Sequence, residues 1–223
     1  MWDRWPGRAS RSRTSAYRRR KPGRALLVLA VLLIAAAVVW VRAIGHAKDV
    51  NALTRCPASS DGQETPLPYS ALDTVTPAPP NEVRVTVLNG SNQRGLATEV
   101  SAQLTDLGFG PGAAPADDPL YPQGNLQCMG QIRFGPDGAA AARTLSLLVP
   151  CTQLVRDDRA GAMVDLSVGT NFSALTPSSA AHTILDQLTA WSKAHPATQS
   201  GNDVAPHITI APSLLAAAHT ATC

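Results

Sequence analysis

An uninterrupted run of apolar residues near the N-terminus places the strongest constraint on the fold of this chain. Residues 25–41 read ALLVLAVLLIAAAVVWV, and residues 42–45 extend the segment to 21 residues. About 20 predominantly apolar residues span the hydrocarbon core of a bilayer as a helix, and Arg42 can direct its charged end towards the interface. Trp40 lies near one end, where interfacial aromatic residues are common. The sequence therefore predicts one transmembrane helix over residues 25–45.

A cleaved signal peptide is the alternative interpretation of this run. The apolar region of a signal peptide is usually shorter, and its small residues precede a polar mature sequence. Here the alanines at 35–37 are followed by VVWV. The sequence favours an uncleaved span.

Charged residues are divided unevenly about the apolar run. Residues 1–42 contain ten of the 19 basic residues and one of the 16 acidic residues, a net charge of +9, which leaves −6 for residues 43–223. An excess of Lys and Arg marks the cytoplasmic side of a membrane helix. Residues 1–24 are therefore predicted to be a basic cytoplasmic tail, and the C-terminal part to be extracytoplasmic. Nucleic acid is not an expected partner, because the part of the chain that folds is acidic.

All four cysteines lie on the predicted outer side of the membrane: Cys56, Cys128, Cys151 and Cys223. An even number of cysteines in an oxidising compartment is typical of two disulfides, and four cysteines allow three pairings. We expect Cys128–Cys151, which closes a short loop, together with Cys56–Cys223. Metal binding is not predicted, because no CxxC or Cys–His pair has the spacing of metal ligands.

Residues 46–81 are predicted to be a stalk followed by a linker. Six prolines fall between Pro57 and Pro80. Such a segment favours extended geometry over a helix. Cys56 would attach the start of the linker to the domain.

Residues 82–173 alternate between strand and helix patterns. Apolar residues at 83, 85 and 87 predict a strand that ends at Asn89 and Gly90. A helix follows from about residue 93, with one apolar stripe formed by residues 96, 100, 104 and 107 and with Gly108 as its C-terminal cap. A weaker strand is predicted over 109–114, a strand over 130–135, a helix over 137–149, and strands over 151–157 and 162–169 joined by a hairpin turn at 157–161. The result is an α/β domain, a compact two-layer sandwich of order β-α-β-β-α-β-β.

The remaining residues, 174–223, are predicted to pack on this domain. An amphipathic helix is expected over residues 178–194, followed by a tail with a short helix at 213–219.

The loop after the first strand is the candidate ligand site. It lies between a strand and a helix start, where backbone N–H groups of nucleotide-binding proteins hold phosphate. Gly90 and Gly95 have the spacing of P-loop glycines, but Leu96 and Ala97 replace the lysine and the hydroxyl residue, and GSNQRG lacks the GxGxxG pattern. Asn, Gly and Ser are also the usual residues of turns and helix caps. The sequence favours a turn and a cap, and leaves open an anion site formed by Asn89, Gly90, Ser91, Asn92, Arg94 and Gly95.

The sequence contains no pattern typical of catalysis. It has neither a GxSxG nor an HExxH motif. The acidic pairs at 117–118 and 157–158 are expected in solvated turns, and Arg133, Arg143 and Arg156 are expected in surface ion pairs. Four of the five histidines fall in the last helix and the tail, where solvated or capping roles are expected. We predict a protein that is not an enzyme and has no cofactor.

Three segments resemble the LytR C-terminal domain family: VRVTVLNGSNQRGLATEVSAQLTDLGF at 83–109, GQIRFGPDGAAAARTLSLLVP at 130–150 and AMVDLSVGTNF at 162–172. The resemblance covers roughly residues 82–173. In many members this domain follows a LytR-CpsA-Psr phosphotransferase domain, which joins glycopolymers to peptidoglycan. Here the predicted linker leads directly into the module. The resemblance therefore implies a cell-envelope role without transferase chemistry, and it supplies no ligand residues.

The leading interpretation is a membrane-anchored extracytoplasmic module that supports envelope integrity by binding a protein or a cell-wall or lipid component. The alternative is an enzyme or carrier that acts on a phosphorylated envelope precursor held by the Gly90–Gly95 loop. A third possibility is a structural component of a division or wall-synthesis complex.

Overall fold

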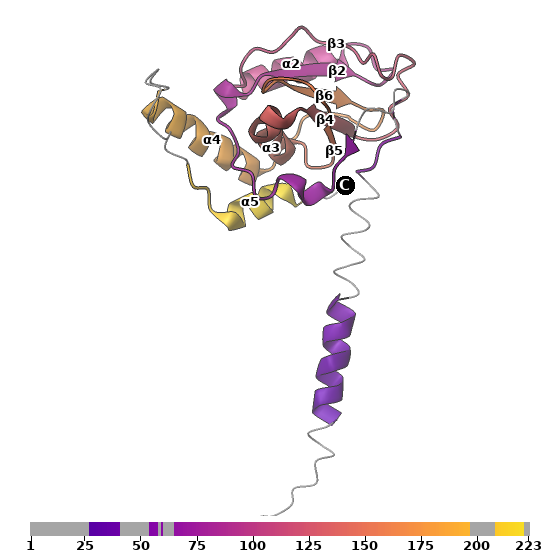
Figure 1. Cartoon of the computed structure of the whole chain (residues 1–223), viewed down its shortest axis with the longest axis vertical. Coiled ribbons are helices and arrows are strands. Elements are labelled where there is room, and N and C mark those ends of the chain that lie inside the picture. The colour runs from indigo at the N-terminus through magenta and orange to yellow at the C-terminus, as the bar shows by residue number, and fades with distance from the viewer. Residues whose placement is uncertain (1–26, 41–53, 58, 60–64, 197–207, 221–223) are drawn as a thin grey trace, which may run out of the picture. The chain divides into compact units, whose positions relative to one another are not determined.

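The computed structural model describes residues 27–40, 54–57, 59, 65–196 and 208–220 (Figure 1). The chain divides into two compact units, Met1–Gly45 and His46–Cys223. In the first unit, residues 27–40 form a helix with exposed side chains. Within the described ranges, no helix combines the length and the apolar character needed to cross a membrane.

The second unit is built on a mixed sheet of six strands in the order β1-β5-β4-β6-β2-β3 (Figure 1). Parallel pairs join β4 to β5 and β2 to both β6 and β3, whereas β4–β6 and β1–β5 are antiparallel. The strands are β1 (Thr65–Pro66), β2 (Val85–Asn89), β3 (Ala116–Asp117), β4 (Gly130–Phe134), β5 (Gln153–Arg156) and β6 (Val164–Val168).

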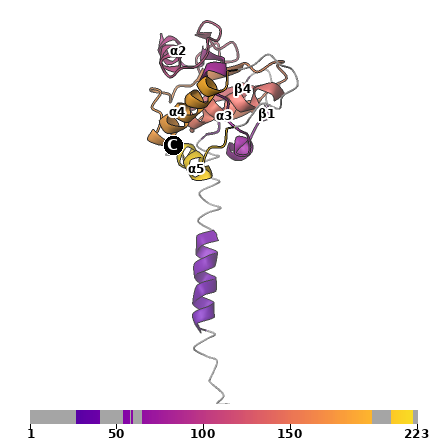
Figure 2. The same cartoon turned by 90° about the vertical axis from the view of Figure 1, so that its left-hand side faces the viewer.

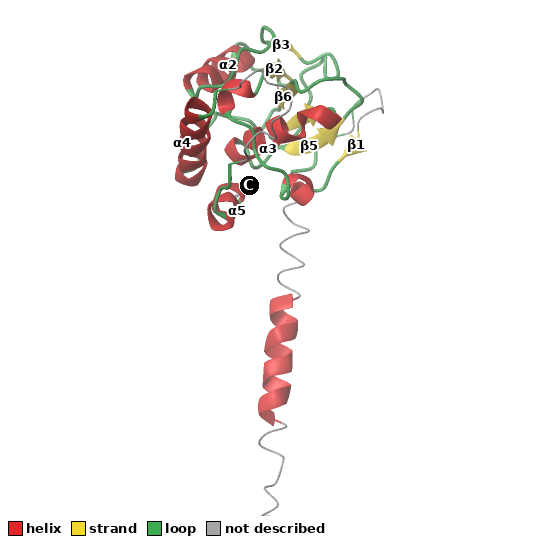
Figure 3. Cartoon of the chain, turned by 60° about the vertical axis from the view of Figure 1, so that its left-hand side comes forward, coloured by secondary structure: helices red, strands yellow, loops and turns green. Residues whose placement is uncertain are grey.

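The helices of this unit gather on one side of the strands (Figure 3). They are α2 (Leu96–Asp106), α3 (Ala139–Leu148), α4 (Ser179–Ala194) and α5 (Pro212–His219), with the short 3-10 turns η1 (Tyr69–Leu72), η2 (Pro80–Glu82) and η3 (Pro136–Gly138). Successive side chains of a strand point to opposite faces of the sheet. The helix-facing set forms the main core with the apolar stripes of α2 and α3, and it includes Val85, Val87, Ile132, Phe134, Val164 and Leu166. The predicted mixed α/β architecture is confirmed.

A second apolar cluster joins α3, α4 and α5, which lie close together in Figure 2. Leu147 of α3 packs with Ile184 and Leu188 of α4 and with Ile210 just before α5. Helices α4 and α5 therefore pack on the domain through α3.

The predicted hairpin between β5 and β6 is wrong, because β4 lies between these strands in the sheet. The segment β4-α3-β5 is a parallel crossover that places β5 on the outer side of β4. β6 instead pairs with β4 on one side and with β2 on the other. The turn residues at 157–161 indicate a change of direction, but they do not specify the partner strand.

The predicted strand over 109–114 is also wrong. Pro111 and Pro115 lack the N–H group that a strand ladder needs. The described pairing is confined to a bridge between Gly110 and Arg84, just before β2, and to the two residues of β3. Phe109 nevertheless packs in the main core.

Much of the predicted linker belongs to the folded domain. Leu72 of η1 is 2% exposed and lies in the main core. Leu67 and Val75 pack against the same core, and β1 pairs with the outer edge of β5. The prolines favour extended backbone, as expected. The apolar residues between them pack against the main core, so the segment is part of the domain.

The predicted disulfide pairs are wrong. Cys56 forms a disulfide with Cys128, with a Cα–Cα distance of 5.1 Å and a sequence separation of 72 residues. Cys151 is also disulfide-bonded, and Cys223 lies outside the described residues. Short spacing favoured Cys128–Cys151, but the fold brings Cys56, Tyr121, Leu126 and Cys128 into one small apolar cluster.

Candidate functional site

The loop that follows β2 is closed by its own side chains. Asn89 Oδ1 accepts hydrogen bonds from the Ser91 N–H at 3.1 Å and the Ser91 hydroxyl at 2.8 Å. The Gln93 N–H donates to Ser91 Oγ at 3.1 Å, and Asn89 Nδ2 donates to the Gln93 carbonyl at 3.0 Å. Two N–H groups that an anion would need at this position are therefore occupied by the loop itself. This is the arrangement of a side-chain-stabilised turn.

The two glycines of the loop are required for different structural reasons. A Cβ on Gly90 would lie 2.9 Å from both Cβ and Cδ2 of Leu126 and 3.0 Å from Ser167 Oγ. Gly95 has a φ of 80° as the residue before α2, a conformation that glycine adopts without steric cost. Their P-loop-like spacing thus follows from packing at one position and from backbone geometry at the other.

A pocket of about 290 Å³ lies beside this loop. Arg94 is exposed, and Asp117, which also lines the pocket, carries the opposite charge. Of the six predicted site residues, Gly90 is buried outside the pocket, and the other five line it together with Asp117, Tyr121, Pro122 and Gly124. The structure therefore brings the predicted residues together, but in a pocket of balanced charge.

A buried ion pair lies beneath this region, on the face of the sheet away from the helices. Arg133 donates to the Asp118 carboxylate at 3.0 Å and 2.7 Å, and the two residues are 2% and 1% exposed. The Ser167 hydroxyl also donates to Asp118. Arg133 points to this face because Ile132 and Phe134, its neighbours in β4, fill the main core. The expectation that Asp118 and Arg133 are solvated is wrong.

Two glutamines extend this pair across the sheet. The Arg133 guanidinium donates to Gln131 Oε1 at 3.0 Å and 2.8 Å, and Gln131 Nε2 donates to Gln153 Oε1 at 3.2 Å. We refer to Asp118, Arg133, Gln131 and Gln153 as the polar row. The sequence contained one signal for it, since polar residues two positions apart interrupt an otherwise apolar strand.

A second charged cluster joins η1, α3 and α5. Asp73 Oδ1 lies 3.1 Å from both Arg143 NH1 and His219 Nδ1. The His219 ring stacks on Tyr69 with 4.0 Å between centroids, and the Tyr69 hydroxyl donates to the His219 carbonyl at 2.5 Å. Burial and the nearby Arg143 lower the pKa of His219, and Asp73 opposes them. The expectation of a solvated or capping role does not hold for His219, and Arg143 is 2% exposed rather than at the surface.

The buried polar groups described above are thus engaged mainly with one another. Across these residues, no group of three or more His, Cys, Asp or Glu side chains is placed to hold a metal ion. What the geometry offers is a rigid platform whose loops and edges can contact a ligand.

Comparison with known proteins identifies the family. The family model described as LytR cell envelope-related transcriptional attenuator matches residues 82–172. The cell envelope integrity protein Cei of Mycobacterium tuberculosis is 40% identical over 166 residues, which cover 71% of this chain and 76% of Cei. This chain belongs to the Cei family. Its resemblance to the LytR C-terminal domain family is therefore confirmed.

A solved structure agrees with the Cei family assignment. The soluble domain of a conserved hypothetical secreted protein from Mycobacterium marinum is 34% identical, and the match covers 71% of this chain and 97% of that domain with a TM-score of 0.58. Membership of the Cei family makes this an envelope-related protein.

Proposed function

We propose that this chain is a membrane-anchored extracytoplasmic module that supports the integrity of the cell envelope by binding an envelope protein or a cell-wall or lipid component. Membership of the Cei family is the observation that carries the proposal, because a relative named for cell envelope integrity is 40% identical over most of both chains. The apolar run at 25–45, the basic residues before it and the acidic remainder support anchoring with the domain outside. The Cys56–Cys128 disulfide supports an oxidising compartment.

Binding rather than catalysis is supported by the site beside β2. Its hydrogen-bonding groups hold the turn together, and its two charged side chains, Arg94 and Asp117, have opposite signs. A module of this kind acts by presenting a fixed surface.

A complementation experiment tests the proposal. A strain from which the gene is deleted should take up more of a membrane-impermeant dye, and the full chain should restore the barrier. Residues 46–223, exported behind a cleavable signal peptide, should restore it poorly. If deletion leaves dye uptake unchanged, the envelope role is wrong; if the exported domain restores the barrier fully, anchoring is not required.

The alternative, a carrier or enzyme for a phosphorylated precursor, is favoured by the pocket that Ser91 and Arg94 line. The double variant Ser91→Ala/Arg94→Ala tests it in the same strain, with Arg84→Ala as a control for the loss of an exposed arginine. We expect both variants to restore the barrier. Failure of the double variant would support the phosphate site only if Ser91→Ala by itself restores the barrier, because the Ser91 hydroxyl also holds the turn. Cross-linking in cells addresses the third possibility, because a component of a wall-synthesis complex should yield membrane-protein adducts.

A further inference from the structure

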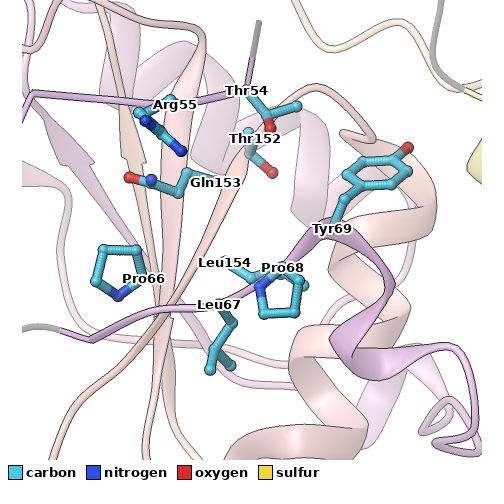
Figure 4. Close-up of a pocket in the computed structure, with 9 residues that line it drawn as sticks. All are labelled: Thr54, Arg55, Pro66, Leu67, Pro68, Tyr69, Thr152, Gln153 and Leu154. Carbon is cyan, nitrogen blue, oxygen red and sulfur yellow. The ribbon is translucent and has the colours of Figure 1, made fainter. Parts of the chain in front are cut away.

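A second pocket, of about 300 Å³, lies at the opposite edge of the sheet (Figure 4). Three segments far apart in sequence form it: the residues beside Cys56, the β1–η1 connection and the start of β5. Its lining residues are Thr54, Arg55, Pro66, Leu67, Pro68, Tyr69, Thr152, Gln153 and Leu154. Figure 4 shows the side chains of Arg55 and Gln153 directed towards each other, with the rings of Pro66 and Pro68 on the other side of the pocket.

The polar row fixes the orientation of the Gln153 amide in this pocket. Arg133 can only donate hydrogen bonds, so the Gln131 atom that it contacts must be the oxygen Oε1. Gln131 Nε2 therefore donates, and the Gln153 atom that it meets at 3.2 Å must be Oε1. The remaining Gln153 group, Nε2, is a donor, and it has no hydrogen-bond partner among the described residues. Since Gln153 is only 8% exposed, the fold holds an unused N–H donor at the pocket wall.

Arg55 supplies positive charge beside this donor. Its side chain is exposed, and in the described ranges it makes no ion pair or hydrogen bond. The lining residues include no Asp or Glu. In contrast to the pocket beside β2, this one therefore has an unbalanced cation and donors that need an acceptor. The Cys56–Cys128 disulfide adjoins Arg55 and fixes the backbone that presents it.

The other wall is apolar and small. Pro66, Pro68, Leu67 and Leu154 provide flat aliphatic surface, which suits the C–H face of a saturated ring. A volume of about 300 Å³ lies at the lower end of the range for ligand pockets, roughly 300–1,000 Å³. That size suits a single sugar-like ring better than an acyl chain or a chain of several sugars.

We propose that this pocket binds a small anionic polyol, that is, a carboxylate or phosphate carried on a hydroxylated ring. Arg55 pairs with the anionic group, Gln153 Nε2 donates to an oxygen of the ligand, and the proline rings contact the ring face. The inference rests on the proposed envelope function, because envelope glycans present sugar carboxylates and lipid headgroups present polyol phosphates.

Calorimetry on the full chain tests the site. The chain is placed in phosphatidylcholine nanodiscs, so that no anionic lipid competes, and is titrated with glucuronate, inositol 1-phosphate, glucose and inorganic phosphate. At least one of the two ring anions should bind at least tenfold more tightly than glucose and inorganic phosphate. If glucuronate binds more tightly, the natural ligand is a sugar acid; if inositol 1-phosphate binds more tightly, it is a polyol phosphate.

Variants assign this binding to the pocket. Arg55→Gln should weaken binding at least tenfold, and Gln153→Met should weaken it severalfold. Arg84→Gln, with the same charge change at another exposed arginine, should alter it less than twofold. Arg55 is exposed, so Arg55→Gln should fold normally, and its thermal unfolding verifies this. The proposal is overturned if neither ring anion binds, if inorganic phosphate binds as tightly as they do, or if Arg55→Gln binds normally.

Complementation separates this proposal from the proposed function. If Arg55→Gln restores the barrier fully in the deletion strain, the pocket does not serve the envelope role, although that role stands. If deletion itself has no effect, the envelope role fails, and the calorimetric result remains valid for the pocket alone.

Discussion

At the scale of single residues, Asp118 and Arg133 place two opposite charges where water is excluded. Each is fully engaged: Asp118 accepts from Arg133 and Ser167, and Arg133 also donates to Gln131. A buried pair of this kind contributes little net stability compared with an apolar pair of the same shape, but removal of one partner leaves the other charge uncompensated. The pair ties the loop that carries Asp118 to this face of the sheet.

Asp118→Asn should lower the free energy of unfolding by about 3–5 kcal/mol, because it leaves the Arg133 charge buried without a counterion. Urea denaturation measures the change. The exposed neighbour provides a control, since Asp117→Asn should change stability by less than about 0.5 kcal/mol. Equal effects at the two positions would show that the buried pair has no special role.

Gly90 of the VLNG segment should be required for packing against Leu126. Gly90→Ala should destabilise the domain by about 1–3 kcal/mol, because its methyl group overlaps Leu126. In a Leu126→Ala background, which removes the Cδ2 contact but keeps the Cβ contact, the same substitution should cost less. A double-mutant cycle by urea denaturation measures this coupling, and strict additivity of the two changes would contradict the explanation.

His219 should make stability depend on pH. Its pKa is lowered in the folded state, so the folded chain binds the proton more weakly than the unfolded chain, whose histidines titrate near pH 6.5. The contribution of neutral His219 to the free energy of unfolding is therefore complete above about pH 6.5. It is lost as the pH falls from that value towards the pKa of His219 in the folded chain. Tyr69, Asp73 and Arg143 face the ring.

His219→Phe keeps the stacking surface and removes the titration. The loss of unfolding free energy between pH 7.5 and pH 5.0 should be smaller in this variant than in the natural chain. Identical losses would mean that other groups account for the pH dependence.

At the scale of elements, connections between distant segments determine the arrangement. β6 joins β4 to β2, and so connects the half of the sheet that carries α3 with the half that carries α2. The Cys56–Cys128 disulfide ties the segment before β1 to the loop that covers the polar row. Both connections join residues that are far apart in the sequence. Local sequence patterns therefore predicted the elements but missed which elements pair with one another.

Removal of this disulfide should lower stability substantially. For a closed loop of this length, the chain-entropy model gives about 4 kcal/mol. The double variant Cys56→Ser/Cys128→Ser leaves neither of these thiols unpaired, and urea denaturation measures its loss of unfolding free energy. Peptide mapping without reduction should recover Cys56 linked to Cys128, and a Cys128–Cys151 peptide would contradict the fold.

At the scale of the whole molecule, charge and hydropathy predict how the chain lies across a membrane. The net charge of +9 before residue 43 and −6 after it predicts a cytoplasmic N-terminus. In spheroplasts of cells that express the chain with different tags at its two ends, added protease should remove the C-terminal tag and spare the N-terminal tag. Detergent should expose both. Loss of the N-terminal tag in intact spheroplasts would reverse the proposed topology.

The sequence by itself determined the apolar segment, the asymmetry of charge, the mixed α/β class and the approximate positions of most helices and strands. Each of these depends on residues that are close together in the chain, through a periodicity of two or 3.6 or through the length of an apolar run. The six residues proposed as a site were also local, and five of them do line one pocket.

Only the tertiary structure decided that β4 separates β5 from β6, that Cys56 meets Cys128, and that Asp118 and Arg133 are buried. It also placed Arg55 beside Gln153, from segments nearly one hundred residues apart. The physical reason is the same in every case. The burial and the partners of a side chain depend on which distant segment packs over it. The local sequence pattern predicts which face of a strand or helix the side chain lies on, but it does not identify the segment that packs against that face.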